Sequence, residues 1–298
     1  MIDLTIAIAS CGRESLVRTL VSLDHMRVPT GMDIEIVIAD DDPHEAATER
    51  VATSGARKLP VRCIPVGARN ISTARNACLD AARGALVAFI DDDEWVSPGW
   101  LIRMLACREE FGATAVFGPV LPQYPTGTAG WLIKADPLYV EWGRRGTVVT
   151  TGRSGNALMD LEFVERKGVR FDPELGRTGG EDTAFFAELH EKGGKLVVTD
   201  DAMVFETVPA ERMTVDYFRT RSLRSGQSYA RIVLGEDAGL LRRGFFAFDA
   251  TAKMTVAFAT AALLKPMNQA SSLKFSIKGW MNLGKLRDVA GRDMAAMH

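Results

Sequence analysis

The sequence of 298 residues lacks the features that mark several common classes of protein. Its four cysteines are scattered and form no CxxC pair, as expected for reduced, mostly buried thiols of a cytosolic protein. Its four histidines are dispersed, and none forms a metal-ligand pair. No GxGxxG follows the first apolar run and no GxxxxGK[ST] occurs anywhere, which argues against a dinucleotide-binding fold and against a P-loop.

The sequence also lacks a strong charge of either sign. A formal net charge of -2 gives no indication of nucleic-acid binding, and the start of the chain has no basic n-region, so no export signal is predicted. The charge is nevertheless uneven, because residues 242–298 carry nine Lys/Arg and three Asp/Glu. This segment therefore has a formal net charge of +6, and the rest of the chain has one of -8. Such asymmetry favours a C-terminal segment with its own partner, such as an anionic surface.

What the first ninety residues do have is a regular alternation of apolar runs and helical stretches. The apolar, β-branched runs lie at residues 4–9, 34–39, 61–66 and 86–90, and the helical stretches lie at 14–26 and 72–84. Ser72 is the predicted N-cap of the second helical stretch and Gly84 is its predicted stop. Strands that alternate with helices predict an α/β fold with a mostly parallel central sheet flanked by helices.

After residue 113 the pattern is less regular. The sequence predicts a strand that enters a proline-containing loop near residue 120, then a strand and a helix near residues 150–168 with Asp160 as the cap. Further helices are predicted at residues 181–192 and 214–234. With 47% hydrophobic residues, the chain is long enough to bury a sizeable core.

Polar clusters follow three of the predicted strands. Ser10 and Arg13 lie after the first strand, Asp40 and Asp42 after the second, and residues 91–94 after the fourth. A solvated loop would also be polar. Because ligands bind beyond the carboxyl ends of parallel strands, three such clusters at one sheet edge predict a binding site there.

The cluster after the fourth strand consists of four consecutive acids, DDDE, at residues 91–94. Like charges placed so close together repel one another and cost folding free energy. A Mg²⁺ or Mn²⁺ ion among them would offset that cost, and such ions often bridge carboxylates to substrate phosphates. The run therefore predicts a metal–diphosphate site, with a plain surface acid run as the alternative.

The sequence contains, in this order and within about residues 3–200, the stretches TIAIASCGR, IVIADDD, ARNISTARNACLDAARGALVAFIDDDE and GGED. In these motifs and their order it resembles family 2 glycosyltransferases with a GT-A fold, above all the bacterial branch that builds succinoglycan-type exopolysaccharides. It implies a nucleotide-sugar donor, usually a UDP-sugar, a Mn²⁺ or Mg²⁺ cofactor, and a glycan or lipid-linked acceptor. The QxxRW motif of processive members is absent, which favours the addition of a single sugar.

The resemblance also implies roles for individual residues. Asp40 matches an aspartate that contacts the nucleobase, and Arg75 is the best match to an arginine near the nucleotide; a turn-forming residue and a solvated helix arginine are the alternatives. Asp91 and Asp93 match the DxD motif, with Asp93 as the expected direct metal ligand and Asp92 either at the ribose or turned away. The other residues expected around the nucleotide are Ser10, Arg13 and Asp42.

The GGED stretch matches the ED motif of the family and implies that Asp182 is the catalytic base, with Glu181 as the second candidate. A base that takes the proton of the acceptor hydroxyl, together with a metal that stabilises the leaving diphosphate, suffices for direct displacement with inversion at the anomeric carbon. The alternative is that both acids only stabilise the N-terminus of the helix that they open.

Residues 1–240 are predicted to form the catalytic domain, with the nucleotide-sugar half at about 1–112 and the acceptor half at about 113–240. Residues 241–298 are predicted to form a basic, apolar helical extension. Its uninterrupted apolar stretch, residues 254–264, is far shorter than the ~20 residues of a membrane span. The basic and aromatic residues at 274–286 predict either peripheral contact with the inner face of the cytoplasmic membrane or a helical pair that packs on protein.

Two other functions fit parts of the pattern. A nucleotidyltransferase also uses an acid-bound metal but usually has a glycine-rich basic loop after the first strand, where SCGRES has one glycine. A non-catalytic scaffold subunit would have lost the metal acids or the base, and both are present. The sequence leaves open the role of Arg219, Arg221 and Arg224, and whether Trp131 and Trp142 bind the acceptor or belong to the core.

Overall fold

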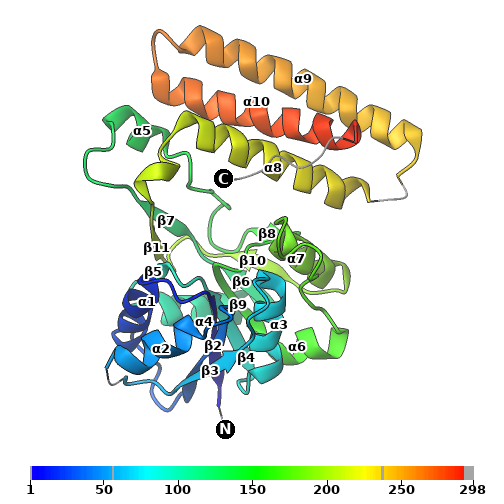
Figure 1. Ribbon diagram of the computed structural model, residues 1–298. Coiled ribbons are helices and arrows are strands. Elements are labelled where there is room, and N and C mark those ends of the chain that lie inside the picture. The colour runs from blue at the N-terminus through cyan, green and yellow to red at the C-terminus, as the bar shows by residue number, and fades with distance from the viewer. Residues whose placement is uncertain (1, 56, 236–237, 292–298) are drawn as a thin grey trace. The chain divides into compact units, whose positions relative to one another are not determined.

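The computed structural model describes residues 2–55, 57–235 and 238–291, and the chain divides into two compact units (Figure 1). Unit 1 consists of residues 1–121 and 140–207, and unit 2 consists of residues 122–139 and 208–298. The chain therefore enters unit 2, returns to unit 1, and enters unit 2 again. The extent of the catalytic domain, predicted as residues 1–240, stays a prediction.

Unit 1 is built on an eight-stranded sheet with the order β3-β2-β1-β4-β9-β6-β10-β8. Its strands are β1 (Leu4–Ser10), β2 (Ile34–Asp40), β3 (Val61–Pro65), β4 (Leu86–Ile90), β6 (Ala115–Phe117), β8 (Val148–Val149), β9 (Asn156–Asp160) and β10 (Leu196–Val198). The first four strands of the chain run parallel to one another, as the sequence predicts. The strand β9 runs antiparallel between β4 and β6, and β8 runs antiparallel to β10.

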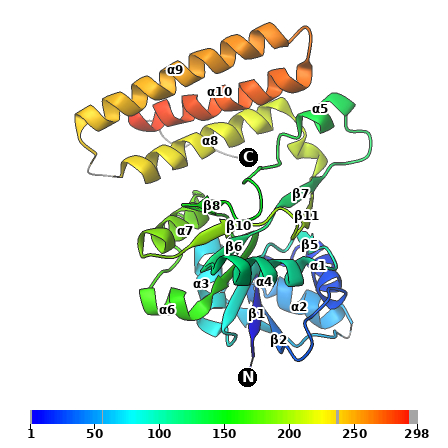
Figure 2. The ribbon, with the colours of Figure 1, turned by 180° about the vertical axis from the view of Figure 1, so that it is seen from behind.

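Helices cover both faces of this sheet (Figure 1 and Figure 2). The helices of unit 1 are α1 (Ser15–Asp24), α2 (Ala46–Thr53), α3 (Ile71–Ala81), α4 (Trp100–Phe111), α6 (Leu161–Lys167) and α7 (Glu181–Glu191). The helices α1, α2 and α4 share one core cluster with Ile6 and Ile8 of β1, whereas α3, α6 and α7 share another with Ala7. This division follows from the alternation of side chains along a strand, which sends neighbouring residues to opposite faces.

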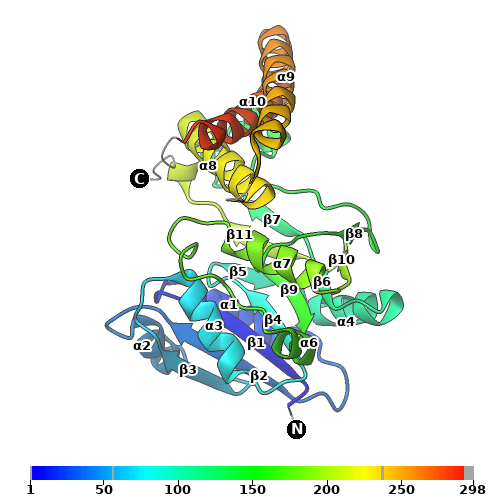
Figure 3. The ribbon, with the colours of Figure 1, turned by 90° about the vertical axis from the view of Figure 1, so that its right-hand side faces the viewer.

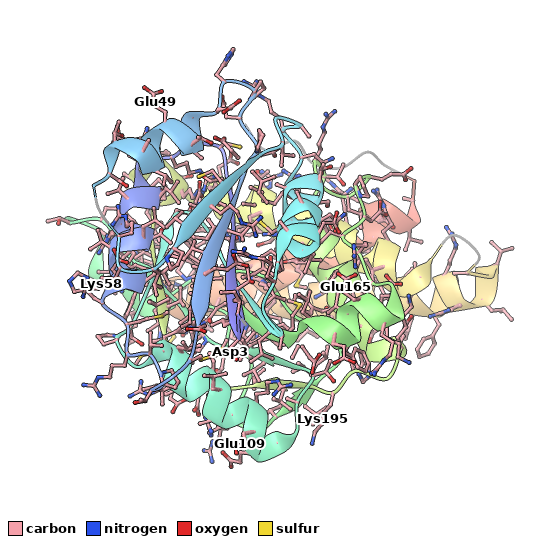
Figure 4. The ribbon with its side chains drawn as sticks, turned by 90° about the horizontal axis from the view of Figure 1, so that it is seen from below. Asp3, Glu49, Lys58, Glu109, Glu165 and Lys195 are labelled. Carbon is pink, nitrogen blue, oxygen red and sulfur yellow. The ribbon has the colours of Figure 1, made fainter. Side chains whose placement is uncertain are left out.

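The outer sides of these helices carry the charge. Glu49, Glu109 and Glu165 project outward from α2, α4 and α6 (Figure 4) and are exposed. The helices are therefore amphipathic, with one apolar side on the sheet and one charged side in water.

A second sheet has three strands in the order β5-β11-β7, formed by β5 (Glu94–Val96), β11 (Val204–Thr207) and β7 (Val120–Gln123).

The start of α3 differs from the prediction, because Asn70 and not Ser72 is the N-cap. The Asn70 side chain accepts hydrogen bonds from the backbone N–H groups of Ser72 (3.1 Å) and Thr73 (3.2 Å). Ser72 is buried inside the first turn of the helix. Both residue types cap helices well, so composition alone could not choose between them.

Gly84 was predicted to stop this helix, but α3 ends three residues earlier. The structure shows a different need for glycine at this position: a Cβ would lie 2.5 Å from the backbone N of Thr5 on β1. The predicted cap at Asp160 is confirmed, since its side chain accepts a hydrogen bond of 2.9 Å from the backbone N–H of Phe163.

Unit 2 is helical, and its long C-terminal helices confirm the predicted helical region. It contains α5 (Gly130–Ala135), a short 3-10 helix (Ala210–Arg212), α8 (Val215–Leu234), α9 (Leu240–Leu264) and α10 (Gln269–Val289). The helix α10 lies between α8 and α9 (Figure 3). Its approach to α8 is close, because a Cβ on Gly226 would lie 1.9 Å from the Met281 carbonyl oxygen. Leu132, Phe218 and Leu273 contribute to the small core of this unit.

The helix α9 extends well beyond the uninterrupted apolar stretch of residues 254–264. It continues through Asp249 and Lys253, whose side chains pair one turn apart at 2.7 Å. Among the described residues, α9 alone has the length and composition of a membrane-crossing helix. Within α9, 17% of the apolar stretch of 18 residues that meets this description is buried inside the structure. Length and composition do not by themselves make it a span.

Candidate active site

The four acids at residues 91–94 begin where β4 ends, and the structure separates them into two pairs. The side chains of Asp91 and Asp93 are 43% and 20% exposed, whereas Asp92 and Glu94 are buried. Residues 91–94 form a turn, in which the backbone N–H of Glu94 donates a hydrogen bond of 3.2 Å to the Asp91 carbonyl. In this turn the DxD aspartates are partly exposed to solvent, while the other two acids face the protein.

Asp92 joins the ends of β4 and β1. It accepts a hydrogen bond of 2.6 Å from the Ser10 hydroxyl and one of 3.1 Å from the Arg13 guanidinium. Burial raises the pKa of Asp92 to about 6, although Ser10 and Arg13 act in the opposite direction. A carboxylate held in this way fixes the polar cluster after β1 against the cluster after β4.

Glu94 supports the backbone of the same turn. Its carboxylate accepts a hydrogen bond of 2.9 Å from the backbone N–H of Asp91, and burial raises its pKa well above the ordinary value. Gly155, just before β9, lies directly against both acids: a Cβ there would sit 2.7 Å from Oε1 of Glu94 and 3.1 Å from Oδ2 of Asp91. A larger residue at this position would push the Glu94 carboxylate away from its present position.

Two arginines neutralise the acids. Arg13 pairs with Asp93 at 2.8 Å in addition to its bond to Asp92. Arg75, on α3, is buried and bridges Asp91 (3.3 Å) and Glu181 (2.7 Å). The Arg75 bridge brings the end of β4 next to the start of α7. Arg75 and Glu181, which pair directly, are 106 positions apart in the sequence.

The start of α7 holds the two acids of the GGED stretch. Gly179 and Gly180 have φ values of 86° and 97°, a region that favours glycine, so the chain can turn sharply into the helix. Glu181 points inward to Arg75; burial and the neighbouring Asp182 raise its pKa, and Arg75 opposes that shift. Asp182 is half-buried and accepts a hydrogen bond of 2.7 Å from the backbone N–H of Thr183.

At the end of β2, Asp40 is fully buried. Its carboxylate accepts hydrogen bonds from the backbone N–H (2.7 Å) and hydroxyl (2.8 Å) of Thr48 in α2, and a longer one of 3.3 Å from the backbone N–H of Asp42. Asp42 itself accepts from the backbone N–H of His44 at 2.8 Å. In this structure both residues thus hold the local backbone. The contact of Asp40 with a nucleobase and the place of Asp42 near the nucleotide stay predictions.

Asp41 is a functional candidate that sequence reasoning missed. It is buried, and it accepts hydrogen bonds from the backbone N–H groups of Ala68 (2.9 Å) and Asn70 (2.6 Å). It therefore orders the loop that leads into α3 and Arg75. The sequence shows Asp41 in the polar run after β2, but not that it bonds to backbone groups 27 and 29 positions further along the chain.

The predicted site residues thus gather at one edge of the unit 1 sheet. Ser10 and Asp40 are register partners on β1 and β2, and the backbone N–H of Asp41 donates to the Ser10 carbonyl at 2.7 Å.

Trp142 belongs to this unit and stacks on Phe117, which fits the core interpretation. Trp131, Arg219, Arg221 and Arg224 lie in unit 2.

The donor set fits a divalent cation that is shared with a ligand. Within residues 2–55, 57–235 and 238–291, no group of three or more His, Cys, Asp or Glu side chains is arranged to hold a metal ion alone. Mg²⁺ and Mn²⁺ need no such cage, since they commonly bind one or two carboxylates and take their other ligands from water and phosphate oxygens. The solvent-facing Asp91 and Asp93 are carboxylates of that kind.

The family model described as glycosyl transferase family 2 matches residues 5–166, more than half of the chain and all three strand-end clusters. The chain belongs to glycosyltransferase family 2. It is 34% identical over 295 residues to the succinoglycan biosynthesis protein ExoM of Rhizobium meliloti (strain 1021), a match that covers 97% of this chain and 94% of that protein. It is also 24% identical over 218 residues to the succinoglycan biosynthesis protein ExoO of the same strain, covering 67% of this chain and 59% of that protein.

Solved structures show that this glycosyltransferase has the predicted GT-A-like α/β fold. The structure of S. aureus TarS in complex with UDP matches with a TM-score of 0.52 at 15% identity, over 98% of this chain and 92% of that chain. The TarS complex with UDP-GlcNAc matches with a TM-score of 0.54 at 14% identity, over 98% and 93% of the two chains. At this level of identity the likeness establishes the fold and nothing about the ligands of this chain.

Proposed function

We propose that this glycosyltransferase moves one sugar from a nucleotide diphosphate sugar, with a UDP-sugar as the first candidate, to a hydroxyl group of a glycan or lipid-linked acceptor in exopolysaccharide synthesis. The similarity to two succinoglycan biosynthesis proteins favours this pathway class. The TarS structures with UDP and UDP-GlcNAc share the fold and favour this class of donor. Action on a lipid-linked acceptor would place the protein at the inner, cytoplasmic face of the membrane.

The observation that carries the proposal is the position of Arg75. Its guanidinium contacts Asp91 of the metal-site candidate and Glu181 of the base-site candidate. Two motifs that the sequence separates by about ninety residues are therefore neighbours in unit 1. A reaction that needs a charged leaving group on one side and a base on the other requires such proximity.

The residues that would hold the metal are Asp93 and Asp91, whose carboxylates face solvent. A bound Mn²⁺ or Mg²⁺ supplies stabilisation of the negative charge that develops on the departing diphosphate. Arg13 contributes positive charge at the same edge through its contact with Asp93. The buried carboxylate of Asp92 keeps Ser10 and Arg13 in place.

The base in this proposal is Asp182 rather than Glu181. Glu181 is buried and occupied by Arg75, so it acts as a positioning residue for α7. Asp182 is half-buried, and its nearest partner is the adjacent residue Thr183. As the acceptor oxygen forms its bond to the anomeric carbon, the bond from that carbon to the diphosphate breaks and the acceptor proton passes to Asp182. One displacement of this kind inverts the anomeric configuration.

The test is a screen of nucleotide sugars with the purified full-length protein, with and without Mn²⁺, in which the released small molecules are identified. The proposal expects release of a nucleoside diphosphate that requires both the metal and an acceptor extract. Release of a sugar 1-phosphate, with transfer of the nucleoside monophosphate, would instead indicate a nucleotidyltransferase. Binding of no donor at all, in the presence of Mn²⁺, would indicate a non-catalytic subunit.

A further inference from the structure

The helix α9 is apolar on two opposite sides. On one side, Ala250, Ala257 and Ala261 are buried, and the Ser272 hydroxyl of α10 donates a hydrogen bond of 2.8 Å to the Ala261 carbonyl. The other side is exposed to solvent along its whole length. Its large members are Leu241, Phe245, Phe248, Val256 and Leu263, all between 65% and 92% exposed.

These five residues, called here the outer stripe, lie in one row. Their spacings of four, three, eight and seven residues match whole turns of an α-helix, so they project to the same side. Ala252 and Ala259, also exposed, fill the gaps in the row. From Leu241 to Leu263 the row is about 33 Å long at 1.5 Å per residue. Contiguous apolar surface of this extent marks an interaction site on a soluble domain.

We propose that the outer stripe is a membrane-contact face, with α9 lying in the interface of an anionic lipid bilayer. The proposal rests on unit 2 alone and holds whether or not the proposed sugar transfer is correct. It deepens the expected peripheral contact by assigning it to α9 and its apolar side.

The charge of unit 2 favours lipid over a second copy of the chain. Unit 2 contains fifteen Lys/Arg and eight Asp/Glu, a formal charge of +7, while the residues of unit 1 sum to -9. Two copies that met through their outer stripes would place two units with a formal charge of +7 next to each other, and their repulsion would cost free energy. Anionic lipid headgroups instead attract this positive charge. Arg242 and Arg243 at the start of α9 and Lys265 at its end place basic groups at both ends of the stripe.

The contacts of α9 favour lying in the interface over crossing the bilayer. Its inner side is fixed to α10, where Phe258 fills the space over Gly279 so closely that a Cβ there would lie 2.5 Å from the ring. A crossing would detach α9 from α10 and bury the Asp249–Lys253 pair in hydrocarbon. An interfacial position instead immerses the outer stripe and leaves the pair at the water boundary.

For the basic and aromatic segment of α10, residues 274–286, the sequence left open either membrane contact or packing on protein, and the contacts of α10 support packing. The helix α10 is the central helix of unit 2, with Leu273, Gly279 and Gly284 buried in its contacts. Trp280 is half-buried and packs against the core of the unit. The lysines of this segment add positive charge to the unit.

The test is co-sedimentation of the full-length protein with vesicles of phosphatidylcholine, with and without phosphatidylglycerol, at low and high salt. The wild-type protein is expected to bind the anionic vesicles at low salt and to bind neutral vesicles or high-salt samples more weakly. The variant Phe245→Ser/Phe248→Ser is expected to partition at least ~100-fold less, since each buried aromatic side chain is worth more than one factor of ten. The matched control, Val21→Ser/Ile102→Ser, removes two exposed apolar residues of unit 1 and should bind like wild type.

Thermal melting and nucleotide binding of both double variants should match wild type, which shows that the fold is intact. Equal vesicle binding by the stripe variant and the control would overturn the assignment to α9. A wild-type dimer that the stripe variant turns into a monomer, without any vesicle binding, would assign the stripe to a second copy. Retention of the protein in cell membranes after alkaline carbonate extraction would indicate a spanning helix and would also overturn the proposal.

Discussion

At the scale of single residues, the acid run 91–94 shows how neighbouring carboxylates acquire different roles. Asp92 and Glu94 are buried and hold the turn together, through Ser10 and through the backbone N–H of Asp91. Asp91 and Asp93 face solvent and are balanced by Arg75 and Arg13. The two arginines reduce the repulsion between the carboxylates of the run.

The first prediction concerns the base. Asp182→Asn keeps the shape of the side chain and an oxygen that can accept the hydrogen bond from the backbone N–H of Thr183, but it cannot take a proton at neutral pH. Turnover should fall by about 10²–10⁴-fold, the usual contribution of general-base catalysis. Donor binding, measured by titration calorimetry, and the melting temperature should stay close to those of the wild type.

Glu181→Gln is the matched comparison for that prediction. It leaves the buried Arg75 with one charged partner fewer, so it should lower the melting temperature together with activity. If Asp182→Asn transferred sugar at the wild-type rate, Asp182 would have no part in proton removal, and its role would be limited to the N-terminus of α7.

The second prediction concerns the metal. Asp93→Ala should abolish the dependence of nucleotide affinity on Mn²⁺, because it removes one of the two solvent-facing carboxylates. Calorimetric titrations of UDP with and without Mn²⁺ measure this directly. The control is Asp80→Ala, which removes an exposed acid paired with Arg170 on the surface of the same unit and should change nothing. A Mn²⁺-dependent gain in UDP affinity that survives in Asp93→Ala would show that Asp93 only balances the charge of Arg13.

At the scale of elements, the sequence was informative wherever a pattern repeats and uninformative where a single contact decides. Apolar runs with β-branched residues located β1 to β4, and their polar ends located the site edge. By contrast, the choice of Asn70 over Ser72 as the cap depends on where the helix begins, since Asn70 directly precedes its first residue and Ser72 lies inside it. In the sequence Glu94 is the last of four acids that could all lie on the surface. In the structure its side chain is buried and accepts a hydrogen bond from the backbone N–H of Asp91.

The third prediction concerns Glu35, which is almost fully buried. It lies near the start of β2, at the opposite end of the strand from Asp40. It accepts hydrogen bonds from the Thr5 hydroxyl (3.0 Å) and from Arg83 Nε (3.0 Å). Burial raises the pKa of Glu35, but the bonds from Arg83 and Thr5 outweigh it, and the net pKa lies below the ordinary value. A depressed pKa contributes stability above the unfolded pKa, and this contribution is lost as the pH falls through the folded pKa.

Glu35→Gln should therefore lower the free energy of unfolding by about 1.5–3 kcal/mol at neutral pH, the range for hydrogen bonds to a charged group. The difference from wild type should shrink as the pH falls below about 4, where the glutamate is protonated in the unfolded chain and then in the folded one. Urea unfolding between neutral and acid pH measures it, with the exposed Glu49→Gln on α2 as the control. A difference that stays constant with pH would mean that shape, not charge, accounts for the loss.

At the scale of the whole molecule, the chain supplies unit 2 in two segments. Residues 122–139 contribute Leu132 and Ala135 to the same small core as Phe218 of α8 and Leu273 of α10. Deleting the chain after residue 241 would therefore uncover this core and confound any test of membrane contact. Hydrophobic patterning predicted the helices of this region, but not that a segment near residue 130 joins them, because such pairing depends on long-range packing.

The last prediction follows from these separate cores. Leu273→Ala removes a buried side chain from unit 2 and Leu20→Ala removes one from unit 1, and each should destabilise its own core by about 2–5 kcal/mol. Because neither residue contributes to the other core, each variant should shift a different part of the heat-capacity profile in differential scanning calorimetry. UDP with Mn²⁺ provides an independent marker, since a ligand stabilises the part of the protein that binds it. The transition that UDP raises should be the one that Leu20→Ala lowers, and Leu273→Ala should leave UDP affinity unchanged. A single transition lowered equally by both variants would show that the two units unfold as one cooperative body.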